Sequence, residues 1–186
     1  RGAGVRVLGG GAKMADRSLS TASLRTARLE LRDPTRMDVG GFLKLYSDPT
    51  TARYIREAGA VDEATIAEEI DEYAVDFERG WSKHWSCIER SSGAFVGFVA
   101  LHEFRSPTPI LSYAIMPEYR RRGFATEAIG AVLEFAATLN GANSVVAHVH
   151  LDNAASAELL TKIGFVDAGQ VELPRGVRRE FRRALK

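Results

Sequence analysis

The sequence predicts one domain of mixed α/β class, in which about four helices pack on a mixed, mostly antiparallel sheet of six to seven strands. Its length of 186 residues allows one well-buried core and is too short for two ordinary domains. A hydrophobic fraction of 45% and a charged fraction of 26% are typical of a globular protein. Segments with alternating apolar residues, as in strands, are interspersed with segments of helical spacing, in the order β-α-α-β-β-β-α-β-α-β-β.

The first half of the chain is expected to supply one strand and two helices before the sheet continues. Apolar and charged residues alternate over 26–32, as in a half-buried strand. Turn residues at 33–35 open a short helix, which Asp48-Pro49 ends. Apolar residues at helical spacing over 66–77 predict a second helix, which Gly80 stops.

The remaining segments are expected to complete the sheet and add two more helices. Strands are expected over residues 85–89, 94–101, 110–116 and 144–150, from Phe165 onward, and over 177–184. Helices are expected from Ala125 to about residue 140 and from Asn153 to Gly164.

The chain divides into a leader and a domain. Residues 1–22 are rich in Gly, Ala and Ser, and we expect them to form a flexible leader in which Met14 is a candidate start. The domain is expected to cover residues 23–186.

Composition restricts the partners that we expect. Cys87 is the only cysteine, so the sequence has neither an internal disulfide nor a cysteine-based zinc site; we expect a buried strand residue in a cytoplasmic protein. No apolar run approaches the roughly 20 residues of a membrane span, so we expect no membrane partner. The net charge is +1, and arginines over 178–183 would alternate between the faces of a strand, so we expect no direct nucleic-acid binding. His148 and His150 share a strand face without an evident third ligand, so we expect solvent-facing or cleft-facing histidines and no metal.

An arginine-rich loop carries the chemical signal. It joins the strand ending near Met116 to the helix beginning near Ala125. The first N–H groups of a helix lack internal partners and carry partial positive charge, and Gly123 lets the main chain approach a ligand closely. Arg120, Arg121 and Arg122 add charges suited to phosphates, so the loop is a candidate pyrophosphate cradle. An ordinary loop with solvated arginines is the alternative.

Four segments in order resemble the GCN5-related N-acetyltransferase (GNAT) family. Arg120-x-x-Gly123-x-Ala125 resembles its coenzyme A loop, and residues 153–165, with Asn-x-x-Ser and Lys-x-Gly-Phe, resemble its next helical segment. Residues 26–34 and 97–101 resemble its opening and third strands. The spacing is similar to that of the branch containing the ribosomal-protein N-terminal (alanine) acetyltransferases, and the resemblance covers about residues 26–185.

The resemblance implies a sheet that splays open between its fourth and fifth strands, here 110–116 and 144–150, with acetyl-CoA bound in the opening as co-substrate. Backbone groups on the fourth strand would pair with the pantetheine arm, and the amides of 121–126 would hold the pyrophosphate. The implied coenzyme-binding residues are Tyr113, Ala114, Ile115, Arg120, Arg121, Arg122, Gly123, Phe124, Ala125, Thr126, Asn153 and Ser156.

The family mechanism is direct attack of a neutral amine on the thioester in a ternary complex, with a backbone N–H near Ile115 expected to stabilise the oxyanion. Ser156 is the residue that we expect to serve the departing thiolate, while Asn153 caps the helix. Many members carry a glutamate base on the fourth strand, where this chain has Ile110-Leu111. The nearest substitute is Glu103, with His102 beside it.

We expect the acceptor to be a primary amine, most directly the N-terminus of a protein or peptide. An α-amine has a pKa of about 7.7–8.0 and needs less help to lose its proton than a lysine near 10.4. A small-molecule amine (antibiotic, polyamine or amino acid) is the first alternative, and a coenzyme A-binding module with little catalysis is the second. A monomer or a homodimer is expected.

Overall fold

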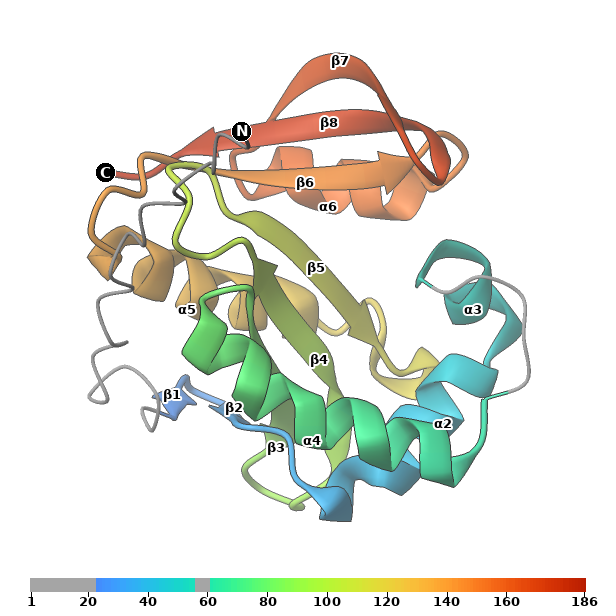
Figure 1. Cartoon of the computed structure of the whole chain (residues 1–186). Helices are drawn as coiled ribbons and strands as arrows, with labels where there is room; N and C mark the ends of the chain where they lie inside the picture. Colours follow the sequence, from blue (N-terminus) through green and yellow to red (C-terminus); the bar gives the residue numbers. More distant parts are fainter. Residues whose placement is uncertain (1–22, 56–60) are drawn as a thin grey trace, which may run out of the picture.

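The computed structural model describes residues 23–55 and 61–186, so the expected leader (1–22) lies outside the described residues. The described part forms one eight-stranded sheet in the order β1-β2-β3-β4-β5-β6-β8-β7, covered by five α-helices (Figure 1). The strands are β1 (Leu24–Arg25), β2 (Leu29–Arg32), β3 (Ser82–Glu89), β4 (Phe95–His102), β5 (Ile110–Ile115), β6 (Ser144–His150), β7 (Val166–Leu173) and β8 (Gly176–Ala184). The α-helices are α2 (Val39–Ser47), α3 (Pro49–Ile55), α4 (Glu63–Arg79), α5 (Phe124–Thr138) and α6 (Ala154–Lys162), and two 3-10 turns are η1 (Arg36–Asp38) and η2 (Pro117–Tyr119).

The sheet is splayed at its single parallel pair. β5 and β6 pair only at Ile110 and Val146, whereas every other neighbouring pair is antiparallel. Beyond that point the first arm (β1–β5) and the second arm (β6, β8 and β7) diverge (Figure 1). The predicted mixed, mostly antiparallel sheet and the predicted place of the splay are both confirmed, with one strand and one helix more than expected.

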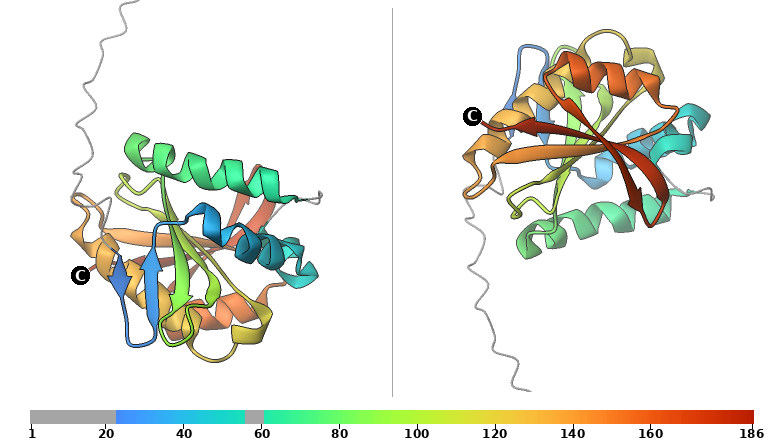
Figure 2. Two further views of the ribbon diagram at one scale, coloured as in Figure 1. Left: turned by 90° about the horizontal axis from the view of Figure 1, so that it is seen from below. Right: turned by 90° about the horizontal axis from the view of Figure 1, so that it is seen from above.

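Helices cover both faces of the first arm. α2 and α4 lie on one face and α5 on the other (Figure 2). Side chains alternate along β4, so Phe98 and Ala100 belong to the core cluster under α2 and α4, while Val99 and Leu101 belong to the cluster under α5. Cys87 is fully buried in the second cluster, as predicted, and burial raises the pKa of its thiol.

The first half of the chain contains a helix that the sequence interpretation missed. α2 ends at Ser47 as expected, but Pro49 opens α3 instead of leading into a loop. Proline suits the first position of a helix, and the Asp48 carboxylate accepts the N–H of Thr51 at 2.8 Å, which is a capping arrangement. Asp48-Pro49 therefore separates two helices.

A buried carboxylate fixes the entry to α2. Asp38 accepts two hydrogen bonds from the Arg32 guanidinium, at 2.7 and 2.8 Å, and one each from the N–H of Thr35 at 2.8 Å and the hydroxyl of Ser86 at 3.0 Å. Burial alone would raise the pKa of Asp38, but these donors outweigh it and hold the pKa below its ordinary value. None of the described helices is both long enough and apolar enough to cross a bilayer.

Candidate active site

A cavity of about 740 Å³, here called the α5 cavity, lies where the sheet opens. Its walls come from β5, the loop after η2, the start of α5, α3 and α6. Every coenzyme-binding residue implied by the sequence lines it, except Arg122.

The start of α5 presents unpaired amides to this cavity. Gly123 is the N-terminal cap at φ 82°, a left-handed conformation that suits glycine, and Arg121, two residues earlier, is also left-handed at φ 58°. The first helical bond runs from the N–H of Glu127 to the carbonyl of Gly123 at 3.1 Å, so the amides of residues 124–126 have no acceptor within the helix. The arrangement is suited to an anion such as a pyrophosphate.

The three arginines of the loop have different environments. Arg120 braces the loop: it donates to the carbonyl of Ile115 at 3.0 Å, to Asp48 at 2.9 Å and to the hydroxyl of Thr51 at 2.7 Å. Arg122 lies outside the cavity lining, with its guanidinium 5.3 Å from the centre of the Phe124 ring. The charges that line the cavity near the helix start therefore include Arg121, and α6 adds Lys162.

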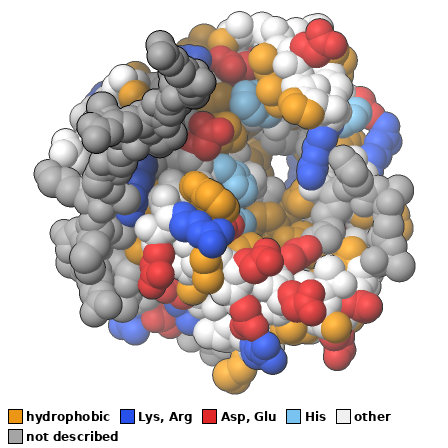
Figure 3. All heavy atoms as spheres, viewed as in Figure 1, with side chains coloured by type: hydrophobic (Ala, Val, Ile, Leu, Met, Phe, Trp, Pro, Cys, Tyr) orange, Lys and Arg blue, Asp and Glu red, His pale blue; other side chains and the backbone are white. Residues whose placement is uncertain are grey.

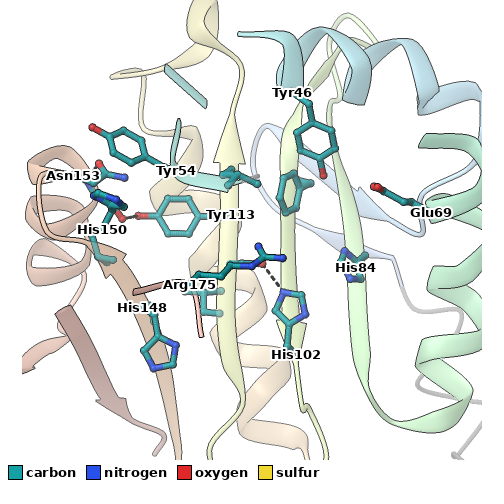
Figure 4. Close-up of a pocket in the computed structure, with 17 residues that line it drawn as sticks. Tyr46, Tyr54, Glu69, His84, His102, Tyr113, His148, His150, Asn153 and Arg175 are labelled. Atoms are coloured by element: carbon teal, nitrogen blue, oxygen red, sulfur yellow. Dashed lines mark hydrogen bonds between the residues drawn. The ribbon is translucent and has the colours of Figure 1, made fainter. Parts of the chain in front are cut away.

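A second cavity of about 610 Å³, here called the histidine cavity, lies between the two arms. Its described walls are Tyr46, Tyr54, Ile55, Glu69, His84, Phe98, His102, Leu111, Ser112, Tyr113, Ala147, His148, Val149, His150, Asn153, Ser156 and Arg175. Figure 4 shows that the side chains of the two arms face one another across it, with Arg175 reaching in from the β7–β8 turn. In the space-filling view a hollow opens on this face, with histidine side chains in its wall (Figure 3).

The two cavities meet at a pair of hydroxyl groups. Tyr54, Ile55, Tyr113, Asn153 and Ser156 line both of them. The phenol of Tyr113, on the first arm, lies 2.8 Å from the hydroxyl of Ser156, at the start of α6 on the second arm (Figure 4). Asn153 caps α6 as predicted, by accepting the N–H of Ser156 at 3.2 Å.

The phenol of Tyr113 is a protonated group at neutral pH. Burial raises the pKa of Tyr113 to about 12, although the hydrogen bond with Ser156 lowers it in part. The meeting point of the cavities thus holds two neutral hydroxyls, either of which can donate to the other or to a group between them.

The four histidines of the histidine cavity are held in different ways. The ring of His84 stacks on Tyr73 with centroids 3.8 Å apart, and burial lowers the pKa of His84 to about 3. His102 lies 2.8 Å from the hydroxyl of Ser112. Of the others, His148 contacts Glu180 on β8 at 3.4 Å and His150 contacts Asp152 at 2.5 Å. Within residues 23–55 and 61–186, no three His, Cys, Asp or Glu side chains form a cluster that could hold a metal ion.

Glu103, the carboxylate nearest the site in the sequence, lies apart from both cavities. It occupies an exposed turn after β4 at φ 49°, and its N–H donates to the carbonyl of Trp81. β4 ends at His102, which lines the histidine cavity, and Glu103 already belongs to the exposed left-handed turn beyond the strand. Glu69, His84 and Arg175 are wall residues that sequence reasoning missed, since each comes from an element distant in sequence from the loop.

The fold is a splayed mixed sheet, and two adjoining cavities lie where its arms diverge. Residues 28–166 match the family model described as Acetyltransferase (GNAT) domain, and the chain belongs to this family. It is therefore an acetyl-CoA-dependent N-acetyltransferase, as the resemblance implied.

Similar proteins act on different kinds of acceptor. The chain is 28% identical over 150 residues to YoaA of Bacillus subtilis (strain 168), named as an uncharacterized N-acetyltransferase, and the match covers 78% of this chain and 84% of that one. Spermidine N-acetyltransferase from Vibrio cholerae, solved with CoA and spermine, has a TM-score of 0.73 at 20% identity, covering 86% of this chain and 97% of that one. Ribosomal-protein-S5-alanine acetyltransferase from Vibrio fischeri has a TM-score of 0.73 at 12% identity, covering 89% and 97%. At these identities the solved structures establish the fold and leave the acceptor open.

Proposed function

We propose that this enzyme acetylates the N-terminal amine of a protein or peptide in the cytoplasm, by direct attack on acetyl-CoA in a ternary complex. The observation that carries the proposal is the charge of the histidine cavity. Among its described wall residues, Glu69 is the one carboxylate and Arg175 the one guanidinium. A polyamine needs several carboxylates along its length, whereas a peptide N-terminus brings one positive charge followed by a polar backbone.

The two cavities suit two substrates. In the proposed arrangement, acetyl-CoA lies in the α5 cavity, with its pantetheine arm along residues 113–115 and its pyrophosphate at the amides that open α5. The acceptor enters through the histidine cavity, and the thioester lies where the cavities meet. A backbone N–H near Ile115 would stabilise the oxyanion.

The leaving thiolate meets the hydroxyl pair in this proposal. Ser156 donates to the developing charge on sulfur, and Tyr113 donates to Ser156 in turn, over the 2.8 Å that separates them. Cys87 takes no part, because it is fully buried in the core. Direct attack needs no acyl-enzyme, so the pair has only to assist departure of the thiolate.

The proposal is tested by thiol release from acetyl-CoA with a panel of acceptors: peptides with different N-termini, the same peptides with a blocked N-terminus and a free lysine, polyamines, and aminoglycosides. Release with free N-termini, and its loss on blocking, is the expected result. Release only with small amines would replace the acceptor class with the first alternative. Tight acetyl-CoA binding by calorimetry without release from any acceptor would indicate a coenzyme A-binding module.

A further inference from the structure

The proposed reaction requires a group that removes a proton from the bound ammonium, and the expected carboxylate, Glu103, lies outside the cavity. We propose that His102 accepts this proton through the hydroxyl of Ser112. The inference rests on the proposed function, because it concerns the amine that enters the histidine cavity.

The geometry provides a short route from the cavity to the imidazole. His102 is the last residue of β4 and pairs with Ile110 at the start of β5, and its Nε2 lies diagonally across the strands, 2.8 Å from the hydroxyl oxygen of Ser112. Ser112 precedes Tyr113 on β5, and all three side chains line the cavity. With the imidazole proton on Nδ1, Nε2 accepts the Ser112 hydroxyl, whose oxygen can in turn accept a proton from an ammonium.

The surroundings of His102 favour a neutral ring that can accept a proton. Burial lowers the pKa of His102, and the carboxylates of Asp76 on α4 and Glu103 in the following turn oppose this in part. On β3, the ring of His84 meets it edge-on at 5.4 Å, and burial keeps His84 uncharged. The lowered pKa keeps most of the His102 rings unprotonated at neutral pH.

The other histidines of the cavity have partners of their own. The second arm holds His148 against Glu180 and His150 against Asp152, and His84 is stacked on Tyr73. Glu69 on α4 is the remaining rival, because it also points into this cavity (Figure 4). It belongs in the experiment for that reason.

The proton balance closes without a further reactant. One proton passes from the ammonium to Ser112 while the Ser112 proton passes to His102, which leaves a neutral amine. The nitrogen lone pair forms the C–N bond and the C–S bond breaks. The Ser156–Tyr113 pair stabilises the departing thiolate by hydrogen bonding, and the second amine proton passes to the sulfur. His102 then releases its proton to solvent, so the products are the amide, coenzyme A and one H⁺.

The test compares His102→Gln with wild type in single-turnover transfer from saturating acetyl-CoA to a peptide identified by the acceptor panel, between pH 5.5 and 9.5. We expect a loss of about 10²-fold at pH 7 that shrinks as the pH approaches 9.5, because the acceptor amine then loses its proton unaided. A peptide acceptor whose terminal amine has a pKa well below 7 should react at similar rates with both enzymes. Ser112→Ala should share the pH dependence with a smaller loss, whereas Ser112→Thr retains the hydroxyl and should restore the rate.

Glu134→Gln is the control, because Glu134 is an exposed carboxylate on α5 that lines neither cavity; this variant should keep the rate at pH 7. Melting temperature and CoA affinity separate folding defects from loss of the proton acceptor. A His102→Gln loss that is the same at every pH and for both acceptors would overturn the inference, as would full activity of this variant. A pH-dependent loss in Glu69→Gln or His150→Gln instead would move the role to that residue. If the wild type is inactive towards every peptide, the proposed function is wrong. That outcome differs from a failure of the inference about His102, in which the wild type is active.

Discussion

The hydrogen bond between Tyr113 and Ser156 allows a kinetic prediction that neither residue allows alone. We expect Tyr113→Phe and Ser156→Ala to slow acetyl transfer by similar factors, and the double variant to be no slower than the slower single variant. The two hydroxyls are 2.8 Å apart where the cavities meet, on opposite arms of the sheet. Groups that act as one unit lose their joint effect when either is removed, so their effects do not add.

The size of the loss follows from the acidity of the phenol. The pKa of Tyr113 is raised to about 12, so complete transfer of its proton to a thiolate of ordinary pKa, about 8.5, climbs roughly 5 kcal/mol. The pair therefore acts mainly by donating a hydrogen bond to charge that develops on sulfur. A hydrogen bond to a charged group contributes about 1.5–3 kcal/mol, which corresponds to a loss of roughly 10- to 150-fold in rate.

Single-turnover quench experiments with labelled acetyl-CoA measure this step, and calorimetry checks that CoA binding is retained. Thr161→Ala is the control, since it deletes a hydroxyl from the same helix, where Thr161 donates to the carbonyl of Ala157 at 2.9 Å away from both cavities. Multiplicative losses in the double variant would show that the hydroxyls act independently. Full activity of Tyr113→Phe beside a slow Ser156→Ala would leave the serine to act alone.

Three other substitutions test the scaffold around the site. Gly123→Ala should lower the free energy of unfolding by about 1–2 kcal/mol in denaturant titrations, because φ 82° is strained for a residue with a Cβ. Arg120→Ala should lower the melting temperature more than Arg121→Ala does, because Arg120 braces the loop through hydrogen bonds to Ile115, Asp48 and Thr51. Asp38→Asn should lower the free energy of unfolding by about 3 kcal/mol at pH 7. Since the folded-state pKa of Asp38 lies below its ordinary 3.8, that deficit should persist above pH 3.8 and shrink as the pH falls through the lowered pKa.

Local patterns in the sequence predicted most of the helices and strands. The strand over 144–150 matches β6 at both ends, and Gly80 ends α4 in the left-handed conformation at φ 78°. The resemblance to a known family added the splay, which no local pattern specifies. The missed helix, α3, begins at a proline, which is equally compatible with the end of one helix and the start of another.

The sequence prediction of the coenzyme site extended over two segments, 113–126 and 153–156, and not beyond them. Each of these segments is short and continuous, so a motif could propose its residues as coenzyme ligands. The histidine cavity combines His84, Ser112 and Arg175 from three separate elements, and only tertiary structure brings them to one place. Arg120 shows the converse: its position in the loop suggested a phosphate ligand, whereas its hydrogen bonds with Asp48 and Thr51 depend on the packing of α3 against the loop.

The proposed acetyl transfer depends on the distance between the two arms of the sheet. Contacts hold this distance at the closed end and at the open end of the splay. At the closed end, Ile110 and Val146 form the single parallel pair. Across the open end, Arg53 on α3 forms an ion pair with Asp152, which also contacts His150 on the second arm. The proposed proton acceptor belongs to the first arm and Ser156 to the second, so this spacing sets how far apart the proton is taken from the amine and delivered to sulfur. Because both partners are exposed, the Arg53–Asp152 ion pair should contribute less than about 1 kcal/mol to stability. Removing the pair should therefore change the rate of acetyl transfer more than the melting temperature.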